Sequence, residues 1–137
     1  MNAKEYLSQA YQLDQRINAK LEQVSNLWAL ATKATSTISD MPRSASTNCQ
    51  RMENTFLKIV DLEQEINGDV DKLVDLKAEI THAIKAVSVP EYQLLLEMRY
   101  LCFKRWEDIA EAMNYNINNL FKLHRKALKE IRVPPKT

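Results

Sequence analysis

The segment from Asn116 to Lys129 holds side chains that suit hydrogen bonding to nucleic acid. Asparagine pairs through two hydrogen bonds with adenine, arginine or lysine pairs with guanine, and an aromatic edge packs against a thymine methyl group. We expect base contacts from five residues near the start or on the outer face of one helix: Asn118, Asn119, Phe121, Lys122 and Arg125. Phosphate contacts position a protein on DNA without specifying sequence, and we expect them from Arg99, Lys104, Arg105, Asn116, Lys126 and Lys129.

A tight turn must position these side chains. Apolar spacing predicts a short helix over residues 106–113, which residues 114–116 interrupt before a second helix begins. Asn114 stands where the first helix must end in a left-handed residue, and Asn116 supplies a side-chain acceptor for the free amides of the second helix. This pattern predicts a helix-turn-helix whose second helix is basic and enters a major groove. The side chains expected in its core are Trp106, Ile109, Leu120, Leu123 and Leu128, and Phe121 fits either the core or the contact surface.

Three groups of residues carry a family resemblance. The first group lies in the first expected helix of the segment and consists of Pro90, Leu94, Leu95, Met98, Arg99, Tyr100 and Leu101. The second group lies in the next helix and consists of Trp106, Glu107, Asp108, Ile109, Ala110, Met113 and Asn114. The third group is the ending L-H-R-x-A-L, with Leu123, His124, Arg125 and Ala127. This run, about 43 of the 137 residues, resembles region four of bacterial sigma factors, which reads the upstream promoter element. Two positions depart from the pattern, because Asn114 replaces the turn glycine and Arg105 replaces the usual Ser or Thr cap.

The resemblance implies a sequence-specific regulator of transcription that binds double-stranded DNA. Stand-alone proteins with a long helical front and such a tail are similar to small phage-encoded transcription regulators, including those that control late genes. A sigma-like piece would also recruit RNA polymerase, which makes the polymerase a candidate partner. The resemblance therefore implies a protein that acts in the cytoplasm of a bacterial host cell.

Composition excludes several other classes. One glycine and four prolines disfavour a sheet-rich fold with many tight turns. The chain lacks an apolar run of about 18 residues, so we expect no membrane span, and its first 15 residues lack the apolar core of a signal peptide. We find no phosphate-binding loop, metal-ligand cluster or nucleophile–base set, and expect no catalysis, cofactor, metal or small-molecule substrate. His82 and His124 are isolated, and we expect each to be solvated or bonded to backbone.

Charge is distributed unevenly along the chain. Residues 99–137 hold nine Lys or Arg and four Asp or Glu, a net charge of +5, whereas residues 1–98 hold ten and fourteen, a net charge of −4. The basic charge thus coincides with the expected helix-turn-helix, which is typical of a surface that approaches phosphates. A solvated helix face that is basic for no functional reason is the alternative.

The first two thirds of the chain show two apolar stripes at helical spacing. Each stripe must bury its seam against the other or against another chain. We therefore expect an all-α protein in which residues 1–87 form a long antiparallel coiled-coil hairpin with a loop at about 39–51, residues 88–133 form the DNA-binding domain, and residues 134–137 form a tail without a role. The expected seam consists of Leu7, Ile17, Leu21, Val24, Trp28, Ile59, Leu62, Ile66, Leu73, Leu76 and Ile80.

Further apolar residues widen both stripes beyond what a two-helix hairpin can cover. We therefore expect a homo-oligomer, a dimer or tetramer, in which two helix-turn-helix units read two half-sites at once. Asp14 and Asp69 interrupt the stripes, and they either fix the register of the hairpin or face solvent where the seam is shallow.

Two alternatives to a regulator stay open. Small terminase subunits also combine a helix-turn-helix with a helical hairpin, and they assemble into rings that load DNA for packaging. An adaptor with a degenerate motif would instead bind RNA polymerase or another protein and not DNA. Oligomer size and charge reversal at Lys122 and Arg125 distinguish these alternatives from the regulator.

Overall fold

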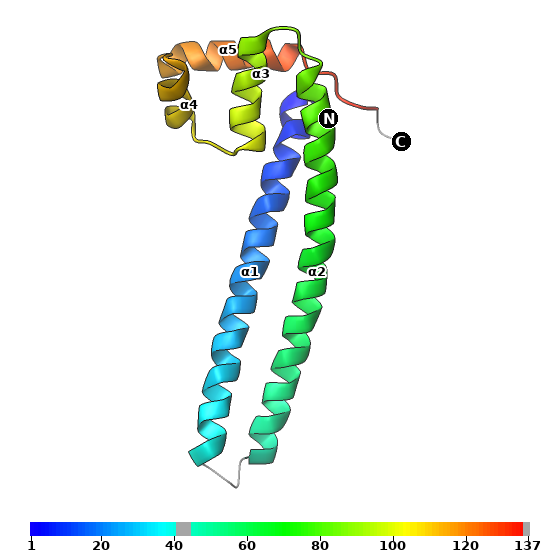
Figure 1. Cartoon of the computed structure of the whole chain (residues 1–137), viewed down its shortest axis with the longest axis vertical. Helices are drawn as coiled ribbons and strands as arrows, with labels where there is room; N and C mark the ends of the chain where they lie inside the picture. Colours follow the sequence, from blue (N-terminus) through cyan, green and yellow to red (C-terminus); the bar gives the residue numbers. More distant parts are fainter. Residues whose placement is uncertain (41–44, 136–137) are drawn as a thin grey trace. The chain divides into compact units, whose positions relative to one another are not determined.

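The structure is a computed structural model that describes residues 1–40 and 45–135, with side chains described for residues 1–33 and 49–135. Its elements are α1 (Ala3–Asp40), α2 (Ala45–Lys85), α3 (Pro90–Leu96), the π-helical segment η2 (Glu97–Leu101), α4 (Trp106–Met113) and α5 (Ile117–Lys129), shown in Figure 1. Every element in the described residues is helical, which confirms the all-α class. No helix within these residues combines the length and apolar composition needed to cross a bilayer.

The chain divides into two compact units. Unit 1 contains Met1–Asp14 and Leu73–Thr137, and unit 2 contains Gln15–Lys72. These limits differ from the boundary that we expected at residue 87, because the ends of both long helices belong to the same unit as the C-terminal segment. Residues 88–133 thus share one compact unit with the ends of both long helices.

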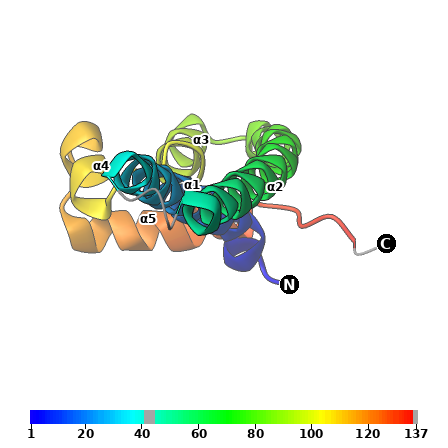
Figure 2. The same cartoon turned by 90° about the horizontal axis from the view of Figure 1, so that it is seen from below.

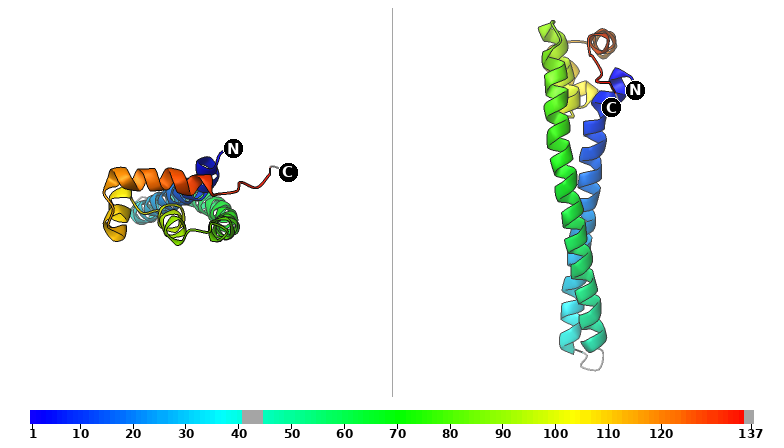
Figure 3. Two further views of the ribbon diagram at one scale, coloured as in Figure 1. Left: turned by 90° about the horizontal axis from the view of Figure 1, so that it is seen from above. Right: turned by 90° about the vertical axis from the view of Figure 1, so that its right-hand side faces the viewer.

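A shared hydrophobic core explains the composition of unit 1. Leu7 from α1, Ile84 from α2, Leu96 from α3 and Ala127 from α5 are all completely buried in it. Figure 3 shows the first turns of α1 beside the C-terminal half of α5. Because four helices contribute to one core, removing any of them would expose apolar surface on the others.

A smaller core lies beneath α4 and α5. It contains Leu95, Ile109, Ala110 and Leu120, with Trp106 packed against them. Figure 2 shows α4 meeting the N-terminal end of α5. This cluster fixes the two helices on α3, which also packs against α5.

Phe103 anchors the connection between η2 and α4 within unit 1. Its ring lies edge-on to Tyr11 of α1, with the ring centroids 5.5 Å apart, and the Lys77 ammonium of α2 lies 4.8 Å from the Phe103 ring centroid. Phe103 has a φ of 57°, in the left-handed region that bulky residues avoid. Packing of the ring offsets this strain, which costs about 1–3 kcal/mol in typical cases.

The joint between α2 and α3 is built around Pro90. Pro90 begins α3, and Val89 before it is extended, as a residue before proline prefers. The side-chain amide of Gln93 donates to the carbonyls of Lys85 and Val87. It thereby satisfies backbone acceptors that the end of α2 leaves free.

In unit 2 the two long helices run antiparallel, since Lys20 pairs with Asp69 and Trp28 contacts Phe56. Of the expected seam in this unit, Ile17, Ile59 and Ile66 are buried, whereas Val24 and Leu62 are partly buried. In unit 1, Leu7 and Ile80 are buried, and Leu73 and Leu76 are partly buried.

Two expected seam residues are not buried. Leu21 is 49% exposed and Trp28 is 47% exposed. The hairpin alone leaves them in contact with solvent, because two helices shield only the row of side chains that points directly at the partner. Burial of these two residues against another chain stays a prediction.

The expected loop at 39–51 was also too long. Residues 39–40 belong to α1 and residues 45–51 to α2, while residues 41–44 lie outside the described residues. Residues 36–50 are rich in Ser and Thr. Such residues are compatible with a helix when the side chain bonds to the backbone one turn earlier, as the Thr55 hydroxyl does with the Arg51 carbonyl, 2.8 Å away.

Asp69 supports the register of unit 2. Its carboxylate accepts a hydrogen bond from the Lys20 ammonium at 2.6 Å, and the two side chains are 14% and 20% exposed. The bond from Lys20 lowers the pKa of Asp69. Of the two roles considered for the polar interruptions, this pairing favours fixing of the register at Asp69.

Candidate nucleic-acid interface

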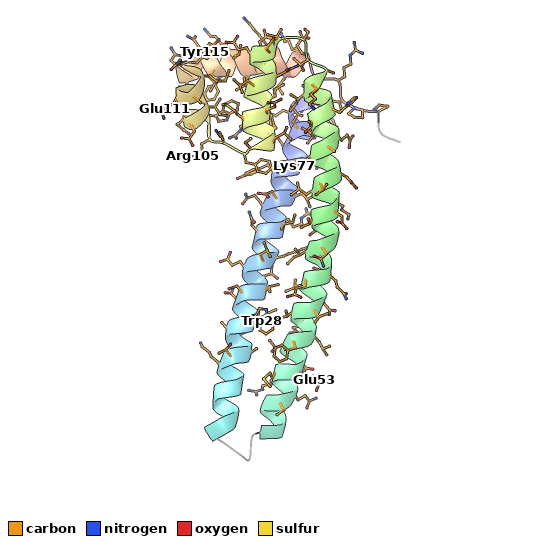
Figure 4. The ribbon with its side chains drawn as sticks, viewed as in Figure 1. Trp28, Glu53, Lys77, Arg105, Glu111 and Tyr115 are labelled. Carbon is orange, nitrogen blue, oxygen red and sulfur yellow. The ribbon has the colours of Figure 1, made fainter. Side chains whose placement is uncertain are left out.

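The turn between α4 and α5 has the backbone geometry that the sequence predicts. Asn114 ends α4 with φ 59° and ψ 40°, in the left-handed region. The amide of Tyr115 then donates to the carbonyl of Ala110 at 3.0 Å, which satisfies an acceptor at the end of α4. The Tyr115 hydroxyl also donates to the carboxylate of Glu91, at the start of α3. Arg105 and Tyr115 mark the two ends of α4 in Figure 4.

Asn116 begins α5 as its cap. The Asn116 Oδ1 accepts a hydrogen bond from the backbone amide of Asn119 at 2.8 Å, as the sequence predicts. Because this oxygen is committed to the cap, the side-chain NH₂ of Asn116 is the group available for the expected phosphate contact. The cap also fixes the position of Asn118 and Asn119 in the first turn.

The two sides of α5 differ sharply in character. Leu120, His124 and Ala127 are buried against the rest of unit 1. The opposite side, which we call the outer face, carries only exposed polar or basic side chains: Asn118, Asn119, Lys122, Arg125, Lys126 and Lys129. Among the described residues, none of the four cations on this face forms an ion pair with a carboxylate. Their charge is therefore directed to solvent or to a partner.

Phe121 lies at the border of the outer face. It is 38% exposed, and its ring packs edge-on against Trp106 with the centroids 5.3 Å apart. One side of the ring thus packs against Trp106 while the ring stays partly exposed, so the contact role of Phe121 stays a prediction. Of the expected core, Ile109 and Leu120 are buried, whereas Trp106, Leu123 and Leu128 are partly buried.

His124 attaches the buried side of α5 to η2. This differs from our expectation of a solvated or backbone-bonded ring. It is buried, and its Nε2 lies 2.6 Å from the Tyr100 hydroxyl of η2. Burial, followed by the positive charges of Lys4 and Arg99, lowers the pKa of His124 to about 4. Burial also raises the pKa of Tyr100 to about 12. Both groups are therefore neutral at pH 7, and their hydrogen bond fixes α5 on η2 without a buried charge.

The expected phosphate ligands outside α5 occupy different environments. Lys104 is exposed, and so is Arg105, although the Arg105 guanidinium pairs with Asp108 at 3.4 Å. Arg99 on η2 is half-buried; its guanidinium lies 4.7 Å from the centroid of the Trp106 ring and donates to the Lys104 carbonyl at 3.0 Å. These contacts orient Arg99 and leave several of its N–H groups unused.

In the described part of the chain, no three His, Cys, Asp or Glu side chains gather as metal ligands would. Searches with this chain against protein-family models, curated proteins and solved structures found no match.

Proposed function

We propose that the chain is a sequence-specific regulator of transcription that binds double-stranded DNA, with α4 and α5 as a helix-turn-helix of the sigma region-four type and α5 as the recognition helix. The outer face of α5 is the observation that carries this proposal. Its amides, with Lys122 and Arg125, suit base edges, whereas Lys126 and Lys129 suit phosphates. Its first turn is fixed by the Asn116 cap. The late-gene regulators of phage, with a bacterial cytoplasm as their site of action, are the class that the sequence resembles.

The proposal includes self-association through unit 2, as a coiled-coil hairpin paired with a second copy. Several large apolar side chains of this unit are exposed in the single chain: Leu21, Trp28, Leu30, Phe56, Leu57, Val60 and Val70. Pairing with a second copy would remove part of this apolar surface from water. A dimer would place two α5 helices on two half-sites and raise affinity without a new base contact.

The test of DNA binding starts with selection of a preferred duplex from a random library. Titrations at several salt concentrations then compare this duplex with a scrambled one. We expect a preference of about a thousandfold or more for the selected duplex. Asn119→Ala combined with Arg125→Ala should abolish the preference, whereas Arg51→Ala combined with Lys58→Ala, which removes exposed cations of unit 2, should retain it.

Two results would replace this proposal with another. If neither duplex binds, and charge reversal at Lys122 and Arg125 leaves binding to RNA polymerase intact, the chain is an adaptor. If light scattering gives a ring of about eight or more copies, the packaging subunit is favoured; a dimer or tetramer supports the regulator.

A further inference from the structure

A pocket in unit 1 brings the start of α1 next to the candidate interface. It has a volume of about 270 Å³. Four elements line it, with α1, η2, α4 and α5 contributing Lys4, Ser8, Arg99, Trp106, Phe121 and Arg125. We call it the cationic pocket. Lys4 and Ser8 are remote in sequence from the segment that we expected to bind DNA.

Three cations line this pocket, and no carboxylate does. Among the described residues, neither Lys4, Arg99 nor Arg125 forms an ion pair. The next polar group, His124, is neutral at pH 7 and supplies no compensating charge. Three like charges around one cavity repel each other, and an anion in the cavity would relieve this repulsion.

The geometry of the cations favours a phosphoryl group over a single carboxylate. Arg99 is held by the Trp106 ring and by the Lys104 carbonyl, so its remaining N–H groups are oriented before a ligand arrives. Guanidinium groups bind phosphate oxygens through paired hydrogen bonds, and an ammonium group adds a point charge. Two guanidinium groups and one ammonium group from three elements match the several oxygens and the negative charge that phosphate monoesters and diesters share.

We propose that Lys4, Arg99 and Arg125 together bind one phosphoryl group in the cationic pocket. The group comes either from a free phosphate monoester or from the backbone of bound DNA. The second source rests on the proposed function and gives Arg125 a phosphate in place of the base contact expected from the sequence. The first source does not rest on that function. In both cases the first turn of α1 contributes a ligand to the site.

The first arm of the experiment titrates the full chain with phenyl phosphate and with inorganic phosphate, at constant ionic strength adjusted with chloride. The probes are Trp106 fluorescence in a Trp28→Phe background and the NMR titration of His124. Saturable binding should change the fluorescence and raise the pKa of His124, because the anion offsets the charges of Lys4 and Arg99. Lys4→Gln should weaken binding about tenfold or more, and Lys4→Arg should restore it.

Lys85→Gln provides the matched control, since Lys85 is an exposed lysine of unit 1 outside the pocket. It should leave phosphate binding unchanged. Urea unfolding of each variant verifies that the fold is retained, which we expect because Lys4 is exposed.

The second arm measures binding of the selected duplex at several salt concentrations. If the group is a backbone phosphate, Lys4→Gln weakens duplex binding. It also reduces the slope of the logarithm of the binding constant against the logarithm of the salt concentration by about 1. If phosphate monoesters saturate the pocket and Lys4→Gln leaves duplex binding unchanged, the ligand is a free monoester. If wild type binds monoesters but no duplex, the proposed function is refuted, whereas the inference that the cationic pocket binds a phosphoryl group is retained. The inference is overturned if no phosphate saturates the pocket and Lys4→Gln leaves duplex binding unaltered.

Discussion

Replacing Leu7 in α1 with alanine should destabilise α4 and α5 more than replacing a leucine inside the C-terminal segment. Leu7 is completely buried in the core that it shares with Ala127 of α5. Leu94 of α3 is 44% exposed and provides the control, because the same substitution on a helix changes helix propensity by a similar amount. If residues 88–133 folded independently of α1, Leu94→Ala would destabilise α4 and α5 more than Leu7→Ala.

The size of the effect follows from burial. Leu7→Ala removes three buried carbons at about 0.8 kcal/mol each, and the cavity that remains brings the loss to about 2–5 kcal/mol. Leu94→Ala should cost less than about 1 kcal/mol, since roughly half of that side chain is already in water. If the free energy of unfolding falls by about 2 kcal/mol per molar urea, Leu7→Ala should lower the urea concentration at the unfolding midpoint by roughly 1–2 M.

The assay is urea unfolding followed by Trp106 fluorescence in a Trp28→Phe background, so that the signal reports on α4. Circular dichroism of the same samples follows total helix. Equal midpoints for Leu7→Ala and the parent protein would refute a core shared between α1 and α5. A larger shift for Leu94→Ala than for Leu7→Ala would show that the C-terminal helices are stabilised from within their own segment.

Substitutions at four other positions test single features of the structure by urea unfolding. Asn114→Ala should cost about 1 kcal/mol because alanine disfavours the left-handed conformation, whereas Asn114→Gly should be close to neutral. Gly68→Ala should stabilise unit 2 by about 0.5–1 kcal/mol, since a Cβ at this helical position meets no atom within 4 Å; a loss of stability would mean that the site is covered. The pKa of His124 is lowered to about 4 in the folded chain, so below about pH 6.5 the unfolded chain takes up a proton that the folded chain does not. The free energy of unfolding should therefore fall by about 2 kcal/mol from pH 7 to pH 4.5. His124→Gln should remove that part of the decline. The pKa of Asp69 is also lowered in the folded chain, so the stability that its carboxylate contributes is present above the unfolded pKa of about 3.9 and is lost as the pH falls through the folded pKa. Asp69→Asn should therefore flatten the fall in the free energy of unfolding below pH 4. An unchanged acid profile would contradict the pairing with Lys20.

Several features of the candidate interface could be predicted from the sequence because they depend on neighbouring residues. Asn114 and Asn116 act on backbone groups within one helical turn, so their roles follow from residue type and position. The exposed amides and cations of α5 follow from the spacing of Leu120 and Ala127 on its buried side.

Other residues could not be placed in this way. His124 looked like an isolated histidine, although a Tyr100 hydroxyl 24 positions away makes it a neutral, buried support for α5. A signal was present, since Tyr100 and His124 both lie on the apolar side of their helices, but spacing alone does not pair them. Phe103 was likewise missed, because its partners Tyr11 and Lys77 come from the two long helices.

The sequence by itself determined that the chain is all-α, where the turn between α4 and α5 falls, and which side chains of α5 point outward. These properties depend on interactions over three or four residues, and such interactions are written directly in residue order. Only the tertiary structure decided that Leu7 is buried while Leu21 is exposed, and that Lys4 lies beside Arg99 and Arg125. Burial and charge clustering depend on which distant segments pack together, and periodicity along one helix does not contain that information.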